Sequence, residues 1–262
     1  MNDTADREGL ESRAPEGLSD VLERVRRLSR DNERLFGELA ASERRLHRLA
    51  RAVWQVQEEE RRRLARELHD GVGQTLTALK NQLEWLREKE GIREASELAD
   101  AVEIVARALR ETREMSRLLR PAVLDDLGLE AALRGLARAV ERPGRLAIDL
   151  DLASLERRLP ATVETVLYRV AQEALSNVMK HSGASRARLA LGKEERRVRL
   201  TVEDSGCGFD PGAVLDAGTA PGIGLRGIRD RTALFGGSLT IAVREEGGMR
   251  LSVTLPVEEV EE

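Results

Sequence analysis

A histidine followed directly by a carboxylate stands in the charged segment EEERRRLARELHDGVGQTL, residues 58–76. The apolar stripe of this segment predicts a helix in which His69 lies about 100° from the core position Leu68, at the edge of the buried face. There a carboxylate such as Asp70 can take up the proton of one ring nitrogen and leave the other nitrogen free to attack a phosphorus atom. Taken alone, His69 could equally be a reactive histidine or an ordinary surface histidine. For His47 we expect an ordinary surface histidine.

Two further motifs carry side chains that suit a nucleotide. Within EALSNVMKH (173–181), Asn177 and Lys180 share a helix face, where an amide oxygen suits Mg²⁺ and an ammonium group reaches a phosphate. In VEDSGCGFD (202–210), a β-type run ends at Asp204, whose carboxylate can accept a hydrogen bond from the exocyclic amine of adenine. Gly206 and Gly208 follow it, and glycine lets the backbone approach a base closely.

A third motif, PGIGLRGIRDR (221–231), places Gly222 and Gly224 before a predicted helix. The amides and the dipole of a helix N-terminus suit a phosphate chain. Each of the three motifs is weak by itself, because ordinary helices and tight turns produce the same patterns. Their order along the chain predicts a site for ATP and Mg²⁺.

The elements that position these residues begin with a heptad seam over residues 18–57. Its positions, three and four residues apart, are Leu18, Val21, Val25, Leu28, Asn32, Leu35, Leu39, Ser42, Leu46, Leu49, Val53 and Val56. With Leu18 at position a, Asn32 also falls on an a position, where its amide can pair with its symmetry mate in a parallel dimer. The alternative is one amphipathic helix packed on a domain, but the narrow seam and its charged flanks favour the coiled coil.

A helical hairpin follows over residues 58–121, with breakers in REKEGIRE (87–94) and a stop at Arg120-Pro121. Its apolar face is too wide for one hairpin, so we expect two chains to form a four-helix bundle and the protein to be a homodimer. From 122 to 257 helices and β-type runs alternate, which predicts a mixed sheet faced by helices. The fold class is α+β and multidomain, with a disordered N-terminus (1–17) and an acidic tail (258–262).

Composition narrows the range of partners. The 43 basic and 47 acidic residues are interspersed, so no whole-protein field points to direct nucleic-acid binding. No apolar run is long enough for a membrane span, and no signal peptide is evident at the start. The single cysteine, Cys207, fits a reducing compartment. We therefore expect a cytoplasmic protein.

The histidine segment contains E-R-x-R-L-A-R-E-L-H-D-x-x-x-Q, which resembles the phosphoacceptor box of two-component sensor histidine kinases, in the subfamily where Asp directly follows the phosphorylated His. This resemblance implies that Asp70 supports autophosphorylation of His69, and that Gln74 positions a water for dephosphorylating the partner. The resemblance further implies that this partner is a response regulator with a receiver domain and a LuxR-type helix-turn-helix DNA-binding domain.

The order NxxKH, DxGxG and GxGLxGI resembles the GHKL-type (Bergerat) ATP-binding domain shared by histidine kinases, type II topoisomerases and related chaperones. It implies that Asn177 coordinates Mg²⁺, that Asp204 reads adenine, and that the glycine loops frame a lid at 209–221 over the triphosphate. Together with the histidine box, the resemblance covers about residues 58–256. The expected activity is ATP-dependent phosphorylation of His69 followed by phosphotransfer to an aspartate of the regulator.

Two other functions stay open at this stage. One is a coiled-coil scaffold whose nucleotide site acts as a switch without phosphotransfer. The other is an ATPase or a serine-directed kinase with the same ATP-binding fold, as in some anti-sigma factors. The acid lability of the phosphoprotein separates these from a histidine kinase.

Overall fold

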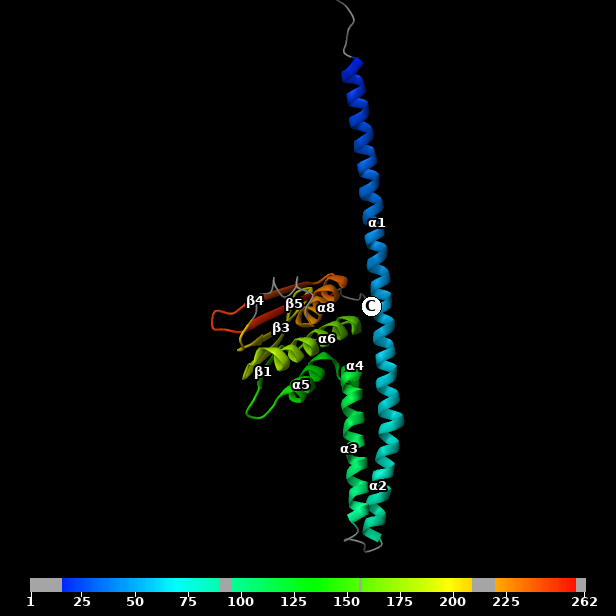
Figure 1. Ribbon diagram of the computed structural model, residues 1–262, viewed down its shortest axis with the longest axis vertical. Coiled ribbons are helices and arrows are strands. Elements are labelled where there is room, and N and C mark those ends of the chain that lie inside the picture. The colour runs from blue at the N-terminus through cyan, green and yellow to red at the C-terminus, as the bar shows by residue number, and fades with distance from the viewer. Residues whose placement is uncertain (1–15, 90–95, 156, 209–219, 258–262) are drawn as a thin grey trace, which may run out of the picture. The chain divides into compact units, whose positions relative to one another are not determined.

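The computed structural model describes residues 16–89, 96–155, 157–208 and 220–257, which fall into two compact units, 1–52 and 53–262. The first unit consists of the N-terminal part of one long helix, α1 (Glu16–Glu67), and the second unit begins within this helix (Figure 1). Of the N-terminal stretch 1–17, residues 1–15 lie outside the described residues, whereas Glu16 and Gly17 already belong to α1. The tail 258–262 also lies outside them.

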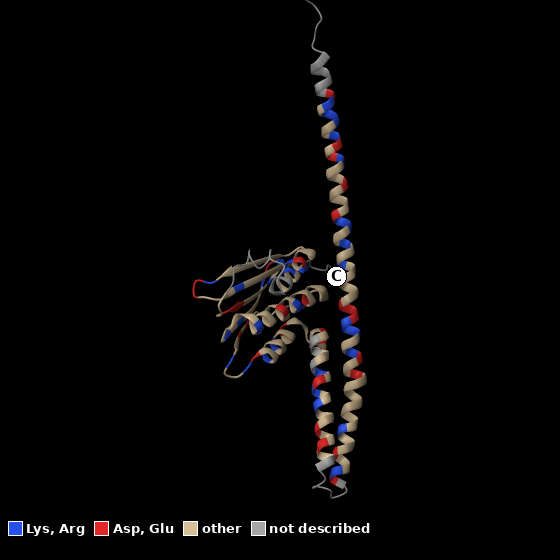
Figure 2. Cartoon of the chain, viewed as in Figure 1, with Lys and Arg blue, Asp and Glu red and all other residues tan. Residues whose placement is uncertain are grey.

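The first unit leaves its heptad seam uncovered. Six apolar residues of the seam are each more than half exposed: Val25, Leu28, Leu35, Leu39, Leu46 and Leu49. Charged residues of both signs alternate along the same helix (Figure 2). A single helix cannot bury such a seam, so the seam needs an apolar partner surface.

In the second unit, the end of α1 continues through a short π-helix, η1 (Leu68–Gly73), into α2 (Gln74–Lys89). The returning helix α3 (Ser96–Leu119) packs against η1 and α2, and Figure 1 shows α2 and α3 side by side. α3 ends just before Arg120-Pro121, as the proline predicts. The residues 90–95 that join the two helices lie outside the described part of the chain.

The hairpin has one buried and one exposed apolar face. Ala65, Val105 and Leu109 are buried between the helices. Other large apolar side chains stay exposed, namely Leu64, Val72, Leu79, Trp85, Ile104 and Met115. This second face is the surface that a four-helix bundle would cover.

After α3, the short helix α4 (Ala122–Asp126) and α5 (Gly128–Val140) precede a five-stranded sheet in the order β1-β2-β3-β5-β4. The strands are β1 (Ala147–Leu152), β2 (Arg186–Glu194), β3 (Arg197–Asp204), β4 (Ser238–Val243) and β5 (Met249–Pro256). Only β1 and β2 pair in parallel. The predicted mixed sheet is therefore confirmed.

Three helices cover the sheet: α5, α6 (Ala161–Asn177) and α8 (Ala220–Leu234) (Figure 1). α6 contacts α5, α8 and the strands β3 and β5, and most of its residues from Glu164 to Leu175 are buried. It passes into a second π-helical turn, η2 (Val178–Ser182), which ends at Gly183 with φ +64°. This central helix holds the residues around Asn177 in a fixed place.

None of the helices in the described ranges is long and apolar enough to cross a membrane.

Candidate functional site

The histidine segment is not the regular α-helix that its apolar spacing predicts. Residues Leu68–Gly73 form η1, a π-helical turn, a deviation that often marks functional sites. Two glycines, Gly71 and Gly73, weaken the α-helix here. The hydroxyls of Thr75 and Thr77 donate to their carbonyl oxygens, at 2.9 and 2.7 Å. The local sequence thus favours a departure from α-helical geometry beside His69.

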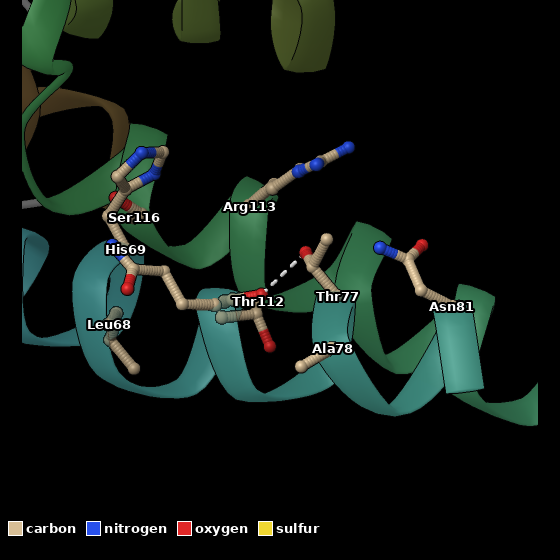
Figure 3. A pocket seen from close by; sticks show the side chains of 10 residues that line it. Leu68, His69, Thr77, Ala78, Asn81, Thr112, Arg113 and Ser116 are labelled. Carbon is tan, nitrogen blue, oxygen red and sulfur yellow. Dashed lines mark hydrogen bonds between the residues drawn. The ribbon is translucent and has the colours of Figure 1, made fainter.

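The side chain of His69 is exposed, as predicted. It lines a groove of about 340 Å³ together with Gln74, Thr77 and Asn81 of α2 and Thr112 and Arg113 of α3. Figure 3 shows the imidazole of His69 and the guanidinium of Arg113 projecting to the same side of the helix pair. Gln74, the first residue of α2, lines the same groove as His69.

Asp70 is exposed too, but it is not among the residues that line this groove. Of the two residues that the histidine box adds to His69, the groove therefore includes Gln74 and not Asp70. Within the described ranges, neither the side chain of His69 nor that of Asp70 has a hydrogen-bond or ion-pair partner. The imidazole is therefore free to meet an incoming group.

A second and larger cavity, of about 1470 Å³, also includes His69. It is also lined by residues of α5 and by Tyr168, Gln172, Glu173 and Ser176 of α6. Its rim includes the cationic residues Arg61, Arg113, Arg138, Arg142 and Arg231. Burial lowers the pKa of Arg231, and the nearby guanidinium groups of Arg169 and Arg61 lower it further. His69 is thus accessible from both of these cavities.

Asp204 ends β3, where alternate residues face the core, and only 7% of it is exposed. Its Oδ1 atom accepts a hydrogen bond of 2.8 Å from the backbone N–H of Gly206. A Cβ on Gly206 would lie 2.2 Å from the carbonyl oxygen of Ser182, and one on Gly248 would lie 2.0 Å from the carbonyl oxygen of Asp204. Three backbone segments therefore converge around this carboxylate, and only glycine permits the approach.

Asn177 is the last residue of α6, and it meets the start of α8. A Cβ on Gly224 would lie 3.5 Å from the Nδ2 atom of Asn177 and closer still to the carboxylate of Glu173. α8 begins at Ala220, so Gly222 and Gly224 lie inside its first turns rather than before the helix, which corrects the prediction. Glycine in a helix costs only about 1 kcal/mol, which packing against α6 can outweigh.

The other predicted residues are close in sequence to these groups. Lys180 is exposed in η2, and Gly208 has φ +66°, a conformation that glycine adopts readily. Residues 209–219 of the expected lid lie outside the described residues. The structure thus groups Asn177 with Gly224, and Asp204 with Gly206 near η2.

Sequence reasoning missed Gly248 and the buried residues Glu58 and Arg169. Gly248 has φ +85°, but a Gly-Gly pair between two strands is typical of any hairpin. Glu58 stands in a run of charged residues that predicts a solvated face, yet only 5% of it is exposed. No local signal distinguished it from Glu59 and Glu60.

Two family models match the chain. Residues 60–124 match a model described as histidine kinase, and residues 162–259 match one described as histidine kinase-, DNA gyrase B-, and HSP90-like ATPase. The first range contains His69 and Gln74, and the second contains Asn177, Asp204 and Gly224.

Curated relatives match over most of the chain. The sensor histidine kinase MctS of Rhizobium johnstonii is 40% identical over 225 residues, which are 84% of this chain and 48% of the relative. The histidine-protein kinase/phosphatase UhpB of Salmonella typhimurium is 37% identical over 88% of this chain and 45% of its own length. DegS of Brevibacillus brevis, also named a kinase/phosphatase, is 31% identical over 86% of this chain and 58% of its own length.

The chain spans about half the length of the curated relatives it matches. Both regions that carry the predicted chemistry fall within the matched ranges. The chain therefore belongs to the histidine kinase family, with a histidine-bearing helical hairpin followed by an ATP-binding domain.

Proposed function

We propose that this chain is an ATP-dependent protein-histidine kinase that phosphorylates His69 and passes the phosphoryl group to an aspartate of a response regulator. The observation that carries the proposal is the exposed imidazole of His69, which has no partner among the described residues and borders two cavities. The ATP-binding domain in the same chain supplies the phosphoryl donor.

At His69, a ring nitrogen forms a bond to the γ-phosphorus of ATP while the bond from that phosphorus to the β–γ bridging oxygen breaks. ADP leaves with the bonding electrons, and the proton on the other ring nitrogen passes to Asp70. Catalysis is then mostly a matter of positioning and of charge neutralisation. Gln74 borders the same groove, where its amide can orient a water that hydrolyses the phosphorylated regulator.

The residues around Asp204 fit adenine. Its buried carboxylate accepts from Gly206 through one oxygen, and the other oxygen suits the exocyclic amine of the base. The missing side chain at Gly206 lets the backbone of Ser182 close on this carboxylate, which holds it in place for the base. Lys180, exposed in the turn after α6, is the cation for a phosphate.

Asn177 is the candidate ligand for Mg²⁺. No group of three or more His, Cys, Asp or Glu side chains that could hold a metal occurs in the described ranges. This fits Mg²⁺, which keeps waters and takes phosphate oxygens in addition to one or two protein ligands. Bound Mg²⁺ would neutralise negative charge on the phosphates.

The kinase acts as a homodimer in this proposal. The exposed heptad seam of the first unit and the exposed apolar face of the hairpin are the surfaces that two copies would bury. The regulator carries a receiver domain and a LuxR-type DNA-binding domain, as the His-Asp-x-x-x-Gln box implies. Two relatives are named kinase/phosphatase, which supports a second activity of Gln74 on that regulator.

The test uses the full chain with ATP labelled in its γ-phosphate. We expect an acid-labile, base-stable label that disappears in His69→Gln and persists in His47→Gln, a matched control because His47 is also an exposed histidine at the helical surface. Equal labelling of the His69→Gln variant would overturn the proposal. An acid-stable label would instead support a serine-directed kinase.

A further inference from the structure

Three residues line both cavities at the histidine: His69 itself, and Arg113 and Ser116 of α3. Arg113 is exposed, and Figure 3 shows its guanidinium group on the same side of the helix pair as the imidazole. Among the described residues, the side chain of Arg113 has no hydrogen-bond or ion-pair partner. Both cavities that reach His69 therefore contain the same unpaired cation.

Arg113 lies on the stripe of α3 that packs against the first helix of the hairpin. This stripe is apolar and buried at Val105 and Leu109. Its next positions, three, four and seven residues after Leu109, are the polar residues Thr112, Arg113 and Ser116, which line the groove at His69. Departures of this kind from the hydrophobic pattern are expected at functional sites, because the arginine gives up apolar burial that the stripe would otherwise provide.

One hydrogen bond joins the turn that carries Arg113 to the turn that carries His69. The Oγ atom of Ser116 donates to the carbonyl oxygen of Ala65 at 3.1 Å. Ser116 lies three residues after Arg113, and Ala65 lies four residues before His69, so each partner of the bond shares a helix face with one of the two side chains. The hairpin itself thus holds Arg113 near His69.

The charge of the lining residues suits an anion. In the smaller groove, the described lining residues include no acidic side chain, and Arg113 is the one fixed charge beside the titratable imidazole. In the larger cavity, Glu173 is the one acidic lining residue within the described ranges, and the other charged groups fixed there are arginines. A guanidinium group binds two oxygens of a phosphoryl group through parallel N–H bonds, so this anion fits the geometry of arginine.

A phosphoryl group on His69 needs a cation that stays with the hairpin. In the proposed function the group arrives from ATP and later leaves to a receiver domain. Lys180 and Mg²⁺ belong to the proposed nucleotide site, so they offset the charge of a phosphate only while nucleotide is bound there. Arg113 is on the same hairpin as His69 and is therefore present in both transfers.

We propose that Arg113 is a catalytic residue of this kinase, which donates two N–H bonds to the phosphoryl group while His69 carries it. In the transfer, a ring nitrogen of His69 forms the bond to the γ-phosphorus, and ADP leaves with the electrons of the oxygen–phosphorus bond that breaks. Arg113 gives up neither a proton nor an electron pair, and its charge offsets the charge on the phosphoryl oxygens. The inference rests on the proposed function, since it takes His69 as the acceptor.

The first experiment compares Arg113→Ala with Arg110→Ala in the full chain. Arg110 is an exposed arginine of α3 that lines neither of the two cavities. We expect Arg113→Ala to slow the initial rate of His69 labelling by ATP about tenfold to a hundredfold, while the affinity for an ATP analogue stays unchanged. Arg113→Lys should fall between the two, because lysine keeps the charge but loses the bidentate contact. Arg110→Ala should label at the wild-type rate.

Guanidinium chloride at a non-denaturing concentration supplies the missing group from solution. It should restore part of the labelling rate of Arg113→Ala and leave that of Arg110→Ala unchanged. A substitution that merely disturbed the hairpin would not respond to the added ion. Wild-type labelling by Arg113→Ala would overturn the proposal, and so would a loss that guanidinium does not restore in protein shown to be folded by circular dichroism. If Arg113→Ala does not fold, Arg113→Gln takes its place.

A second measurement uses no nucleotide. Phosphoramidate phosphorylates an exposed imidazole directly: a ring nitrogen bonds to phosphorus, the phosphorus–nitrogen bond of the reagent breaks, and ammonia leaves with the bonding electrons and takes up a proton. We expect the label on His69 to fall several-fold in Arg113→Ala, because the local concentration of the anion falls with the loss of the cation. The label on His47, another exposed histidine, should stay unchanged in the same sample.

The phosphoramidate result distinguishes a failure of this inference from a failure of the proposed function. If His69 takes no label from ATP but still loses phosphoramidate label in Arg113→Ala, the kinase assignment fails and the phosphoryl contact of Arg113 stands. Equal phosphoramidate labelling of His69 in the wild-type chain and in Arg113→Ala would overturn the contact, whatever the result with ATP.

Discussion

The carboxylate of Glu173 occupies the space in which a side chain on Gly224 would begin, since a Cβ there would lie 2.2 Å from Glu173 Oε1. This contact joins the end of α6 to the first turns of α8. The two helices meet where Asn177 and the glycine motif come together, so the glycine sets how closely the two parts of the proposed nucleotide site approach.

We predict that Gly224→Ala displaces Glu173 and the adjacent Asn177 and weakens nucleotide binding about tenfold. Alanine is the better helix former by about 1 kcal/mol, so the fold should persist. Calorimetric titration with an ATP analogue measures the affinity. The control is Gly227→Ala in the same helix, where no atom lies within 4 Å of the added Cβ. Equal affinities of the two variants would contradict the prediction.

The Asp204→Asn variant should bind nucleotide tenfold to a hundredfold more weakly. It loses a charge-assisted hydrogen bond to the adenine amine, worth roughly 1.5–3 kcal/mol. The neighbouring Glu203→Gln is the control, because that carboxylate pairs with Arg250 at 2.6 Å. Calorimetry that gives the wild-type affinity for Asp204→Asn would exclude the adenine contact.

Tyr168 is the only tyrosine of the chain, so any change in tyrosinate absorbance reports the ionisation of this one residue. Burial raises the pKa of Tyr168 to about 12 from the ordinary 10.0, because the phenolate loses its hydration. The stability linked to this group is complete below pH 10 and is lost as pH rises towards 12. We expect a midpoint near 12 in the folded protein.

In denaturant, the midpoint of the Tyr168 absorbance titration should return to about pH 10. Far-ultraviolet circular dichroism shows whether the chain is still folded at each pH. A midpoint near 10 in folded protein would mean that solvent reaches the phenol.

Leu39→Lys should dissociate the proposed homodimer, since Leu39 occupies a seam position and a charged side chain there cannot be buried between two helices. We expect the dimer dissociation constant to rise at least about a hundredfold, measured by analytical ultracentrifugation. Ala41→Lys adds the same charge off the seam and should leave the dimer intact. Dissociation by both variants would mean that the seam does not define the interface.

The sequence determined the helices, the mixed sheet and the histidine box, because periodicity and residue chemistry are local properties. Alternation of buried and exposed residues marked β3 up to Asp204, and Pro121 marked the end of α3. The groups that can carry the proposed chemistry were identifiable for the same reason. A histidine beside a carboxylate and a glycine after an acidic residue are motifs of residues that are adjacent or nearly adjacent in the sequence.

Only the tertiary structure decided which of these groups meet. Residues Leu68–Gly73 form a π-helical turn, Gln74 rather than Asp70 lines the groove at His69, and α8 begins early enough to enclose Gly224. The ion pair of Glu58 with Arg169 joins residues 111 positions apart. A charged side chain such as Glu58 is buried only when elements that are distant in the sequence pack over it. That packing depends on the free energy of the whole fold and not on the residues next to Glu58 in the sequence.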